Sequence, residues 1–210
     1  MQQLEHVLRR RDLKVLVGLE SPPMIQAFLD RIPYSADPIY RCPRRVLEDR
    51  KAHCYDGALF ATAALRRLGY PPLILDMHAM RDDDHVLALY KRDGLWGAVA
   101  KSNYVGLRYR EPIHRTLREL VMSYFEGFYN LRREKTLRSY TLPLNLRTFD
   151  RLDWMVRDEP LDMVAQRLDE IRHIPLLSER SIQGLCLTDE RSYRAGMQGV
   201  NRAGLYKPGR

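Results

Sequence analysis

Apolar residues recur every three or four positions at the start of the chain, a spacing that places them on one face of a helix. The pattern covers residues 4–16 and again residues 22–32, and the second stretch opens with Pro22 and Pro23, which suit the first turn of a helix. Prolines then interrupt the pattern in the segment IPYSADPIYRCP, residues 32–43. The chain is therefore expected to begin with a helical lead-in.

The next segment, KAHCYDGALFATAALRRLGYPP at residues 51–72, has a different pattern. Between Cys54 and Leu68 its apolar residues, many of them alanine, cover more than one face, which is typical of a helix surrounded by other elements. We expect this helix to begin near His53 and to end at Gly69, because glycine is favoured just after the last helical residue.

Three short apolar runs follow, and their period changes from that of a helix to that of strands. They are LILDMHA, HVLALYK and LWGAVAKS, at residues 73–79, 85–91 and 95–102. Alternation in the second run places His85 on one face of its strand and Val86 on the other. The sequence thus predicts an α+β fold in which the central helix packs on a small antiparallel sheet with flanking helices.

Helical spacing returns at residues 114–134 and 161–174, with a polar link between them at residues 141–154. Four aromatic residues of the first stretch have helical spacing and are expected in the core: Tyr124, Phe125, Phe128 and Tyr129. From residue 178 the chain has frequent glycines and little periodicity. We therefore expect one domain over residues 1–177 and a loop-rich tail over residues 178–210 that is draped over the body or partly mobile.

The composition of the 210 residues, 45% hydrophobic and 30% charged, is that of an ordinary globular protein. No apolar run approaches the roughly 20 residues that cross a bilayer, and the N-terminal residues lack the apolar core of a signal peptide. We expect a cytoplasmic protein that does not contact a membrane. The three cysteines, Cys42, Cys54 and Cys186, form no CxxC pair, so neither a disulfide framework nor a zinc site is expected. No metal or other cofactor is predicted.

The balance of 35 basic and 27 acidic residues gives a net charge of +8, which favours acidic partners. The basic residues form short pairs and triplets without interleaved aromatic residues, so nucleic acid is not the expected partner. The acidic triplet Asp82 to Asp84 is expected in a solvated turn, because three consecutive carboxylates seldom converge on one cation.

Cys54 has two interpretations at this stage. It is either a buried inert thiol or a nucleophile at a helix N-terminus, where unpaired backbone N–H groups and the helix dipole lower the pKa of a thiol. A nucleophile needs a base, and His85 on the second predicted strand is the candidate. A third group commonly accepts the other imidazole N–H, and Ser102 and Asn103 follow the third strand.

Residues 50–112 resemble the transglutaminase-like superfamily, which is related to the papain-like cysteine enzymes. The resemblance lies in CYDGALFATAALRRLGYPP, DDDHVLALY and GLWGAVAKSN. It implies that Cys54 is the nucleophile and His85 the general base. The superfamily typically has an aspartate four residues after the tryptophan, but here Ala100 stands four residues after Trp96. Asn103 is our expected third member in place of that aspartate, with Ser102 as the alternative.

Arg108 and Arg110 alternate on an extended segment beyond Asn103, and they suit either a substrate carboxylate or phosphate or a salt bridge to the aspartates. Together with Trp96 they form the predicted substrate-binding set. The resemblance implies a cysteine hydrolase or acyltransferase that acts on an amide or acyl bond of a peptide, a protein or a small amide. The alternative is an inactive transglutaminase-like fold that serves as a binding or scaffold module for an acidic partner.

Overall fold

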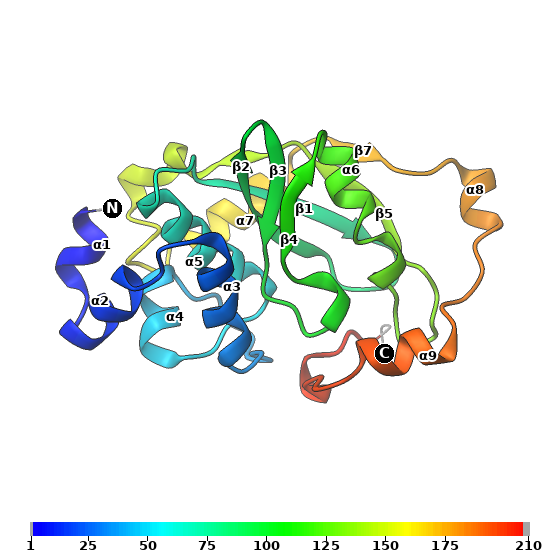
Figure 1. The fold of residues 1–210 in the computed structure, drawn as a ribbon, viewed down its shortest axis with the longest axis horizontal. Coiled ribbons are helices and arrows are strands. Elements are labelled where there is room, and N and C mark those ends of the chain that lie inside the picture. Colours follow the sequence, from blue (N-terminus) through cyan, green and yellow to red (C-terminus); the bar gives the residue numbers. More distant parts are fainter. Residues whose placement is uncertain (1, 208–210) are drawn as a thin grey trace.

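The computed structural model describes residues 2–207, and it has an α+β fold. Seven strands of the described chain form one antiparallel sheet with the order β4-β3-β2-β1-β5-β7, while β6 pairs with β1. The strands are β1 Leu73–Ala79, β2 His85–Arg92, β3 Leu95–Val99, β4 Arg110–His114, β5 Leu137–Thr141, β6 Leu144–Asn145 and β7 His173–Pro175. Helices gather around α5 at one end of the molecule (Figure 1).

The helices of the first half are α1 Gln2–Val7, α2 Arg10–Val17, α3 Pro22–Arg31, α4 Pro43–Asp49 and α5 Cys54–Arg67. Those of the second half are α6 Leu117–Met122, α7 Leu161–Asp169, α8 Glu179–Gln183 and α9 Glu190–Gly196. Short 3-10 turns occupy Val105–Leu107, Phe125–Gly127, Leu146–Leu152 and Arg202–Gly204.

Helix α5 begins and ends where the sequence indicates. His53 is its N-cap: the ring accepts a hydrogen bond from the backbone N–H of Asp56, and the Asp56 carboxylate accepts one from the backbone N–H of His53. This reciprocal arrangement satisfies two of the backbone groups that a helix start leaves unpaired. After the last turn Gly69 has a φ of +92°, a conformation that favours glycine.

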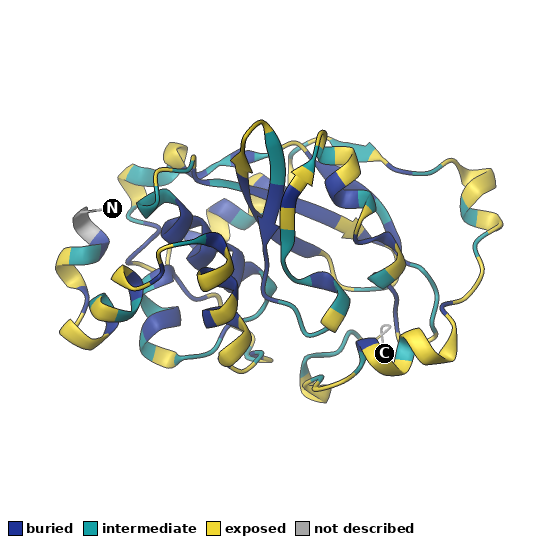
Figure 2. Cartoon of the chain, in the orientation of Figure 1, coloured by how far each residue is buried: buried dark blue, intermediate teal, exposed yellow. Residues whose placement is uncertain are grey.

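The sheet separates two hydrophobic cores. Alternation along β2 directs Val86, Ala88 and Tyr90 toward α5, and it directs Leu87 and Leu89 toward a second core that includes α6. Figure 2 shows α5 and the central strands as the most continuously buried part of the chain. The central helix packed on an antiparallel sheet is therefore confirmed, and the sheet is larger than the three predicted strands.

The predicted helix at residues 114–134 is wrong over most of its length. Only Leu117–Met122 is an α-helix; His114 is the last residue of β4, and a 3-10 turn follows at Phe125–Gly127. The four aromatic residues are buried as expected, at 0% to 7% exposure. Tyr124, Phe125 and Phe128 lie in the second core, so their spacing reflects burial and not a continuous helix.

Three further strands, β5, β6 and β7, were not predicted. Strand β5 lies next to β1 at the centre of the sheet, and β7 replaces the end of the predicted helix at residues 161–174. The tail is also more structured than its pattern indicates, because it contains α8 and α9. No helix of the described residues is long and apolar enough to cross a membrane.

The central position of α5 makes Ala61, which is 0% exposed, a sensitive site. We expect Ala61→Asp to lower the free energy of unfolding by roughly 3 to 5 kcal/mol, because it buries a charge without a partner. Ala27→Asp on the exposed face of α3 is the matched control and should change it far less. Urea denaturation followed by circular dichroism measures both, and equal losses would contradict the central role of α5.

Candidate active site

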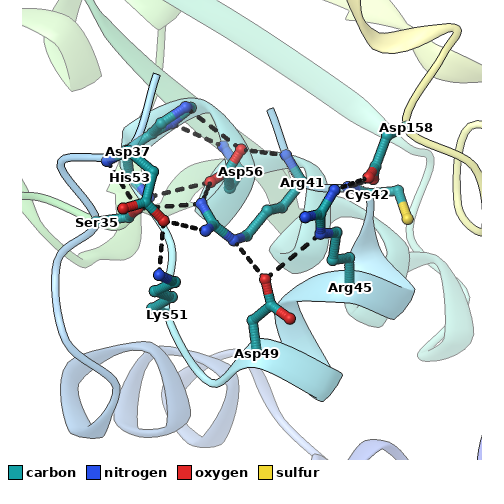
Figure 3. Close-up of polar contacts among 10 residues, drawn as sticks. All are labelled: Ser35, Asp37, Arg41, Cys42, Arg45, Asp49, Lys51, His53, Asp56 and Asp158. Carbon is teal, nitrogen blue, oxygen red and sulfur yellow. Dashed lines mark hydrogen bonds and ion pairs between the residues drawn. The ribbon is translucent and has the colours of Figure 1, made fainter. Parts of the chain in front are cut away.

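The start of α5 is held by a buried ionic network around Arg41, which is 1% exposed (Figure 3). The Arg41 side chain contacts the carboxylates of Asp37 and Asp49, and its backbone N–H donates to Asp56 at 2.7 Å. The Arg41 guanidinium also lies 3.7 Å from the Asp56 carboxylate. Burial raises the pKa of Asp56 to about 7, while the backbone N–H groups of Arg41 and His53 oppose that rise. The network fixes the first turn of α5, and with it Cys54.

Tyr34 is brought to Cys54 by a short parallel bridge between Tyr34 and Ala52. The backbone N–H of Ser35 donates to Ala52 O at 2.9 Å, which continues the pairing. Tyr34 and Cys54 line the same two cavities, and burial, followed by the charge of Cys54, raises the pKa of Tyr34 far above its usual value. Tyr34 therefore remains protonated and can donate a hydrogen bond beside the sulfur.

The Cys54 sulfur lies against the backbone at the start of β2. The thiol donates to Asp84 O at 3.8 Å, and the backbone N–H of Val86 also interacts with the sulfur. Burial, followed by the charges of Asp83 and Asp76, raises the pKa of the Cys54 thiol to about 12. The expectation that the helix N-terminus lowers this pKa is thus wrong for the structure as it stands, because burial and the acidic neighbours outweigh the helix dipole.

The His85 imidazole belongs to the second core. Its Nε2 lies 2.8 Å from Leu107 O, and its ring makes an edge contact with Phe128 at a centroid distance of 6.4 Å. Burial lowers the pKa of His85 to about 4, so the ring is neutral and Nε2 donates to the carbonyl. The acidic triplet that precedes His85 in the sequence does not offset this effect of burial.

Cys54 and His85 line one small cavity of about 30 Å³, but their polar contacts are with other groups. Within residues 2–207 no hydrogen bond joins the sulfur to the imidazole. The reason is the alternation of β2, which directs His85 toward the second core while α5 covers the opposite face. The two predicted residues are neighbours, and a catalytic pair would require the imidazole to turn.

Asn103 also lines the small cavity, yet its amide binds the C-terminal tail. Its Nδ2 donates to Asn201 O at 2.9 Å and to Gly204 O at 3.1 Å, and its Oδ1 accepts from the backbone N–H of Asn201 at 2.8 Å. The Ser102 hydroxyl accepts from the backbone N–H of Tyr104 at 3.0 Å. The carbonyl of Leu107 occupies the position next to the imidazole, and a role of Asn103 in orienting His85 stays a prediction.

The three residues of the predicted substrate-binding set have structural partners. Arg108 pairs with Asp30 at 3.2 Å, which is a salt bridge to α3 and not to the acidic triplet. Arg110 donates to Gly106 O at 2.8 Å and lies over the Tyr124 ring at 3.8 Å. Trp96 packs with Lys91 at 5.1 Å. The lining of the two cavities that contain Cys54 includes none of the three.

A larger cavity of about 550 Å³ opens beside Cys54, a size typical of sites for small ligands. Its walls come from the link before α4, the start of α5, strands β1 and β2, helix α7 and the tail at residues 203–207. Asp76 and Tyr34 are the lining residues that sequence reasoning missed. A polar residue in the apolar run LILDMHA was a signal for Asp76, whereas the proline-broken link gave none for Tyr34.

No group of three or more His, Cys, Asp or Glu within residues 2–207 is arranged to hold a metal ion. The acidic triplet instead has local partners: the Thr136 hydroxyl donates to Asp82 at 2.8 Å, and the backbone N–H of Ala79 donates to Asp84 at 2.7 Å. Asp84 also lies 3.1 Å from His78. These contacts hold the β1–β2 turn next to Cys54.

No family model and no curated protein matches the chain. Three solved structures of LapG from Legionella pneumophila are similar to it. One has a TM-score of 0.35 and 14% identity over 48% of this chain and 68% of LapG. The calcium-bound form has a TM-score of 0.36 and 15% identity over 48% and 69% of the two chains. The EGTA-treated form has a TM-score of 0.40 and 12% identity over 80% and 95%.

Asn103→Ala separates the two roles of that side chain. The change removes three hydrogen bonds to residues 201 and 204, so we expect the tail to loosen and the alkylation of Cys54 by iodoacetamide to become severalfold faster at neutral pH. Mass spectrometry of the Cys54 peptide measures the rate.

Ser102→Ala is the matched control, because Ser102 lines the same small cavity without contacting the tail. It should leave the rate near that of the wild type. A slower alkylation in Asn103→Ala would instead indicate that Asn103 supports the imidazole and the thiolate.

Proposed function

We propose that this protein is a cysteine hydrolase or acyltransferase that acts on an amide or acyl bond of a peptide or protein, with Cys54 as the nucleophile. The observation that supports it best is the placement of Cys54 in the first turn of α5, at the wall of a 550 Å³ cavity and beside the Tyr34 hydroxyl. A rigid helix start that presents a thiol to a cavity is a common arrangement for a cysteine nucleophile.

In the proposed reaction the Cys54 sulfur attacks the carbonyl carbon, and the thiol proton passes to His85. The developing oxyanion would accept hydrogen bonds from the Cys54 backbone N–H and from the hydroxyl of Tyr34, which lines the same cavity. His85 then returns the proton to the leaving amine as the carbon–nitrogen bond breaks. Water or an amine resolves the thioester, which gives hydrolysis or transfer.

The imidazole must leave Leu107 O to take part in these steps. Its ring borders the 30 Å³ cavity that Cys54 also lines, and His85 is the first residue of β2, so the proposal requires the imidazole to turn from the second core toward the sulfur at this strand end. The neutral imidazole can accept a proton, and because burial holds its pKa at about 4, leaving the second core would raise that pKa toward the range that suits a general base. Asn103 is the proposed third member only if the tail releases its amide.

A scaffold role is the second candidate. It is favoured by the protonated Cys54 thiol and by the hydrogen bond of the His85 imidazole to Leu107 O, because neither group is arranged for catalysis in this structure. An acidic partner would have to bind away from the Cys54 cavity, since that cavity is lined by aspartates. The basic surface that the net charge of +8 implies would then be the binding face.

Acylation by p-nitrophenyl acetate distinguishes the two functions, because it reports attack by sulfur without knowledge of the natural substrate. We expect acetylation at Cys54 to be faster than at Cys186, the exposed free cysteine of the same chain. His85→Ala should slow acetylation of Cys54 by a factor of about 10² or more, the usual contribution of a general base. Mass spectrometry of the two cysteine peptides measures both rates.

Two variants complete this experiment. Cys54→Ala should abolish the burst of p-nitrophenolate, and Arg92→Ala, an exposed change at the far end of β2, should leave it unchanged. Acetylation of Cys54 that is no faster than that of Cys186, with His85→Ala without effect, would favour the scaffold.

A further inference from the structure

The cavity beside Cys54 has a strongly acidic lining, although the chain as a whole is basic. Its lining contains one lysine, Lys207, and five aspartates: Asp37, Asp76, Asp83, Asp84 and Asp169. Two of these carboxylates have evident structural partners, since Asp37 pairs with Lys51 at 2.6 Å and Asp84 accepts from the backbone N–H of Ala79. Their charges do not by themselves indicate a ligand.

Asp76 differs from the others, because it is buried and only 4% exposed. Its Oδ1 has no hydrogen-bond partner, and the Thr141 hydroxyl contacts its backbone N–H instead of its carboxylate. Asp76 pairs in register with Val86, shares the α5 face of the sheet with it, and both residues line the cavity. An unpaired carboxylate at the wall of a cavity is a costly feature unless something that enters the cavity binds it.

We propose that the Asp76 cavity binds an organic monocation, the side chain of a lysine or arginine in a polypeptide. The role of that side chain as part of the substrate rests on the proposed function, whereas its binding does not. The ammonium or guanidinium group would lie at Asp76, with Asp84 and Asp169 adding negative charge around it.

The remaining lining fits the stem of such a side chain. Val86, Ala165 and Leu168 supply apolar walls next to the aspartates. Lysine and arginine place their methylene groups along apolar surface while the charged end reaches a polar partner. The apolar walls and the absence of a metal-holding group within residues 2–207 favour an organic cation over a divalent ion.

Binding of a cation at Asp76 changes the protonation of that carboxyl. Burial, and then the charges of Asp84 and Asp169, hold the pKa of Asp76 well above its usual value in the empty cavity. The Cys54 thiol faces the same group from α5. A positive ligand favours the carboxylate, so its binding at neutral pH should release a proton from Asp76.

The experiment is calorimetric titration of the full chain with Nα-acetyl-lysine N-methylamide, with Nα-acetyl-norleucine N-methylamide as the neutral probe. We expect the lysine probe to bind at least about tenfold more tightly than the norleucine probe, in line with a charge-assisted hydrogen bond. Titrations in two buffers of different ionisation enthalpy should show a proton released on binding. Equal binding of the two probes would overturn the proposal.

Asp76→Asn should remove both the preference for lysine and the proton release. Asp93→Asn in the exposed β2–β3 turn is the matched control, because it removes the same charge outside the cavity lining. Asp169→Asn, at the exposed end of α7, should weaken the lysine probe less than Asp76→Asn does. A preference for lysine that survives in Asp76→Asn would also overturn the proposal.

The stability of Asp76→Asn shows whether the variant is folded. A raised pKa in the folded state means that the stability contributed by this group is present below about pH 4 and is lost as the pH rises toward the raised value. The asparagine does not titrate, so the melting temperature of the variant should exceed that of the wild type at neutral pH. The difference in melting temperature between Asp76→Asn and the wild type should decrease as the pH falls toward 4.

These experiments distinguish a failure of the monocation site from a failure of the proposed catalytic function. Cys54→Ala should still bind the lysine probe more tightly than the norleucine probe, which tests the preference for a cation without the nucleophile. Acylation of Cys54 without a preference for lysine would leave the proposed function standing and overturn the monocation site. If calcium competes with the lysine probe, the ligand of the cavity is a metal ion and not an organic cation. That result would also overturn the monocation site.

Discussion

The contact between the buried Arg41 and Asp56 is the constraint on which the candidate site depends. Asp56 accepts the backbone N–H groups of Arg41 and His53, so one carboxylate joins the end of the proline-broken link to the first turn of α5. A buried guanidinium without its carboxylates would be strongly destabilising, which fixes this geometry. The same side chain donates to the Ser35 hydroxyl at 3.0 Å, next to Tyr34. The network in Figure 3 thus joins Ser35, the neighbour of Tyr34 in the chain, to the first turn of α5, which carries Cys54.

A second constraint comes from the sheet, which divides the site between two cores. Strand alternation fixes the face of the sheet to which each residue of β2 points. Because Val86 faces α5, His85 faces the second core. The thiol and the imidazole are therefore desolvated by different neighbours, and burial is the main cause of both shifted pKa values. This division explains why both groups are neutral, although they border the same small cavity.

The sequence predicts the features that depend on local pattern. The limits of α5 follow from His53 and Gly69, and the first hairpins follow from alternation and the turn before Leu95. The aromatic residues at 124–129 misled the prediction, because their spacing records burial in the second core. The partner of Asn103 lies about a hundred residues away in the tail, and no local signal connects the two. The acidic lining of the cavity could not be predicted from the sequence either, because its aspartates come from separate segments of a chain whose net charge is +8.

The C-terminal tail forms part of the surroundings of Cys54. Gly204 borders the small cavity with Cys54 and His85, and residues 203–207 border the larger one, so the tail contributes to the burial of the thiol. Burial is the first cause of the raised thiol pKa, and the hydrogen bonds of Asn103 hold this part of the tail next to the two cavities. The amide of Asn103, which the sequence places near the third position of the triad, instead holds a segment that lines both cavities at Cys54.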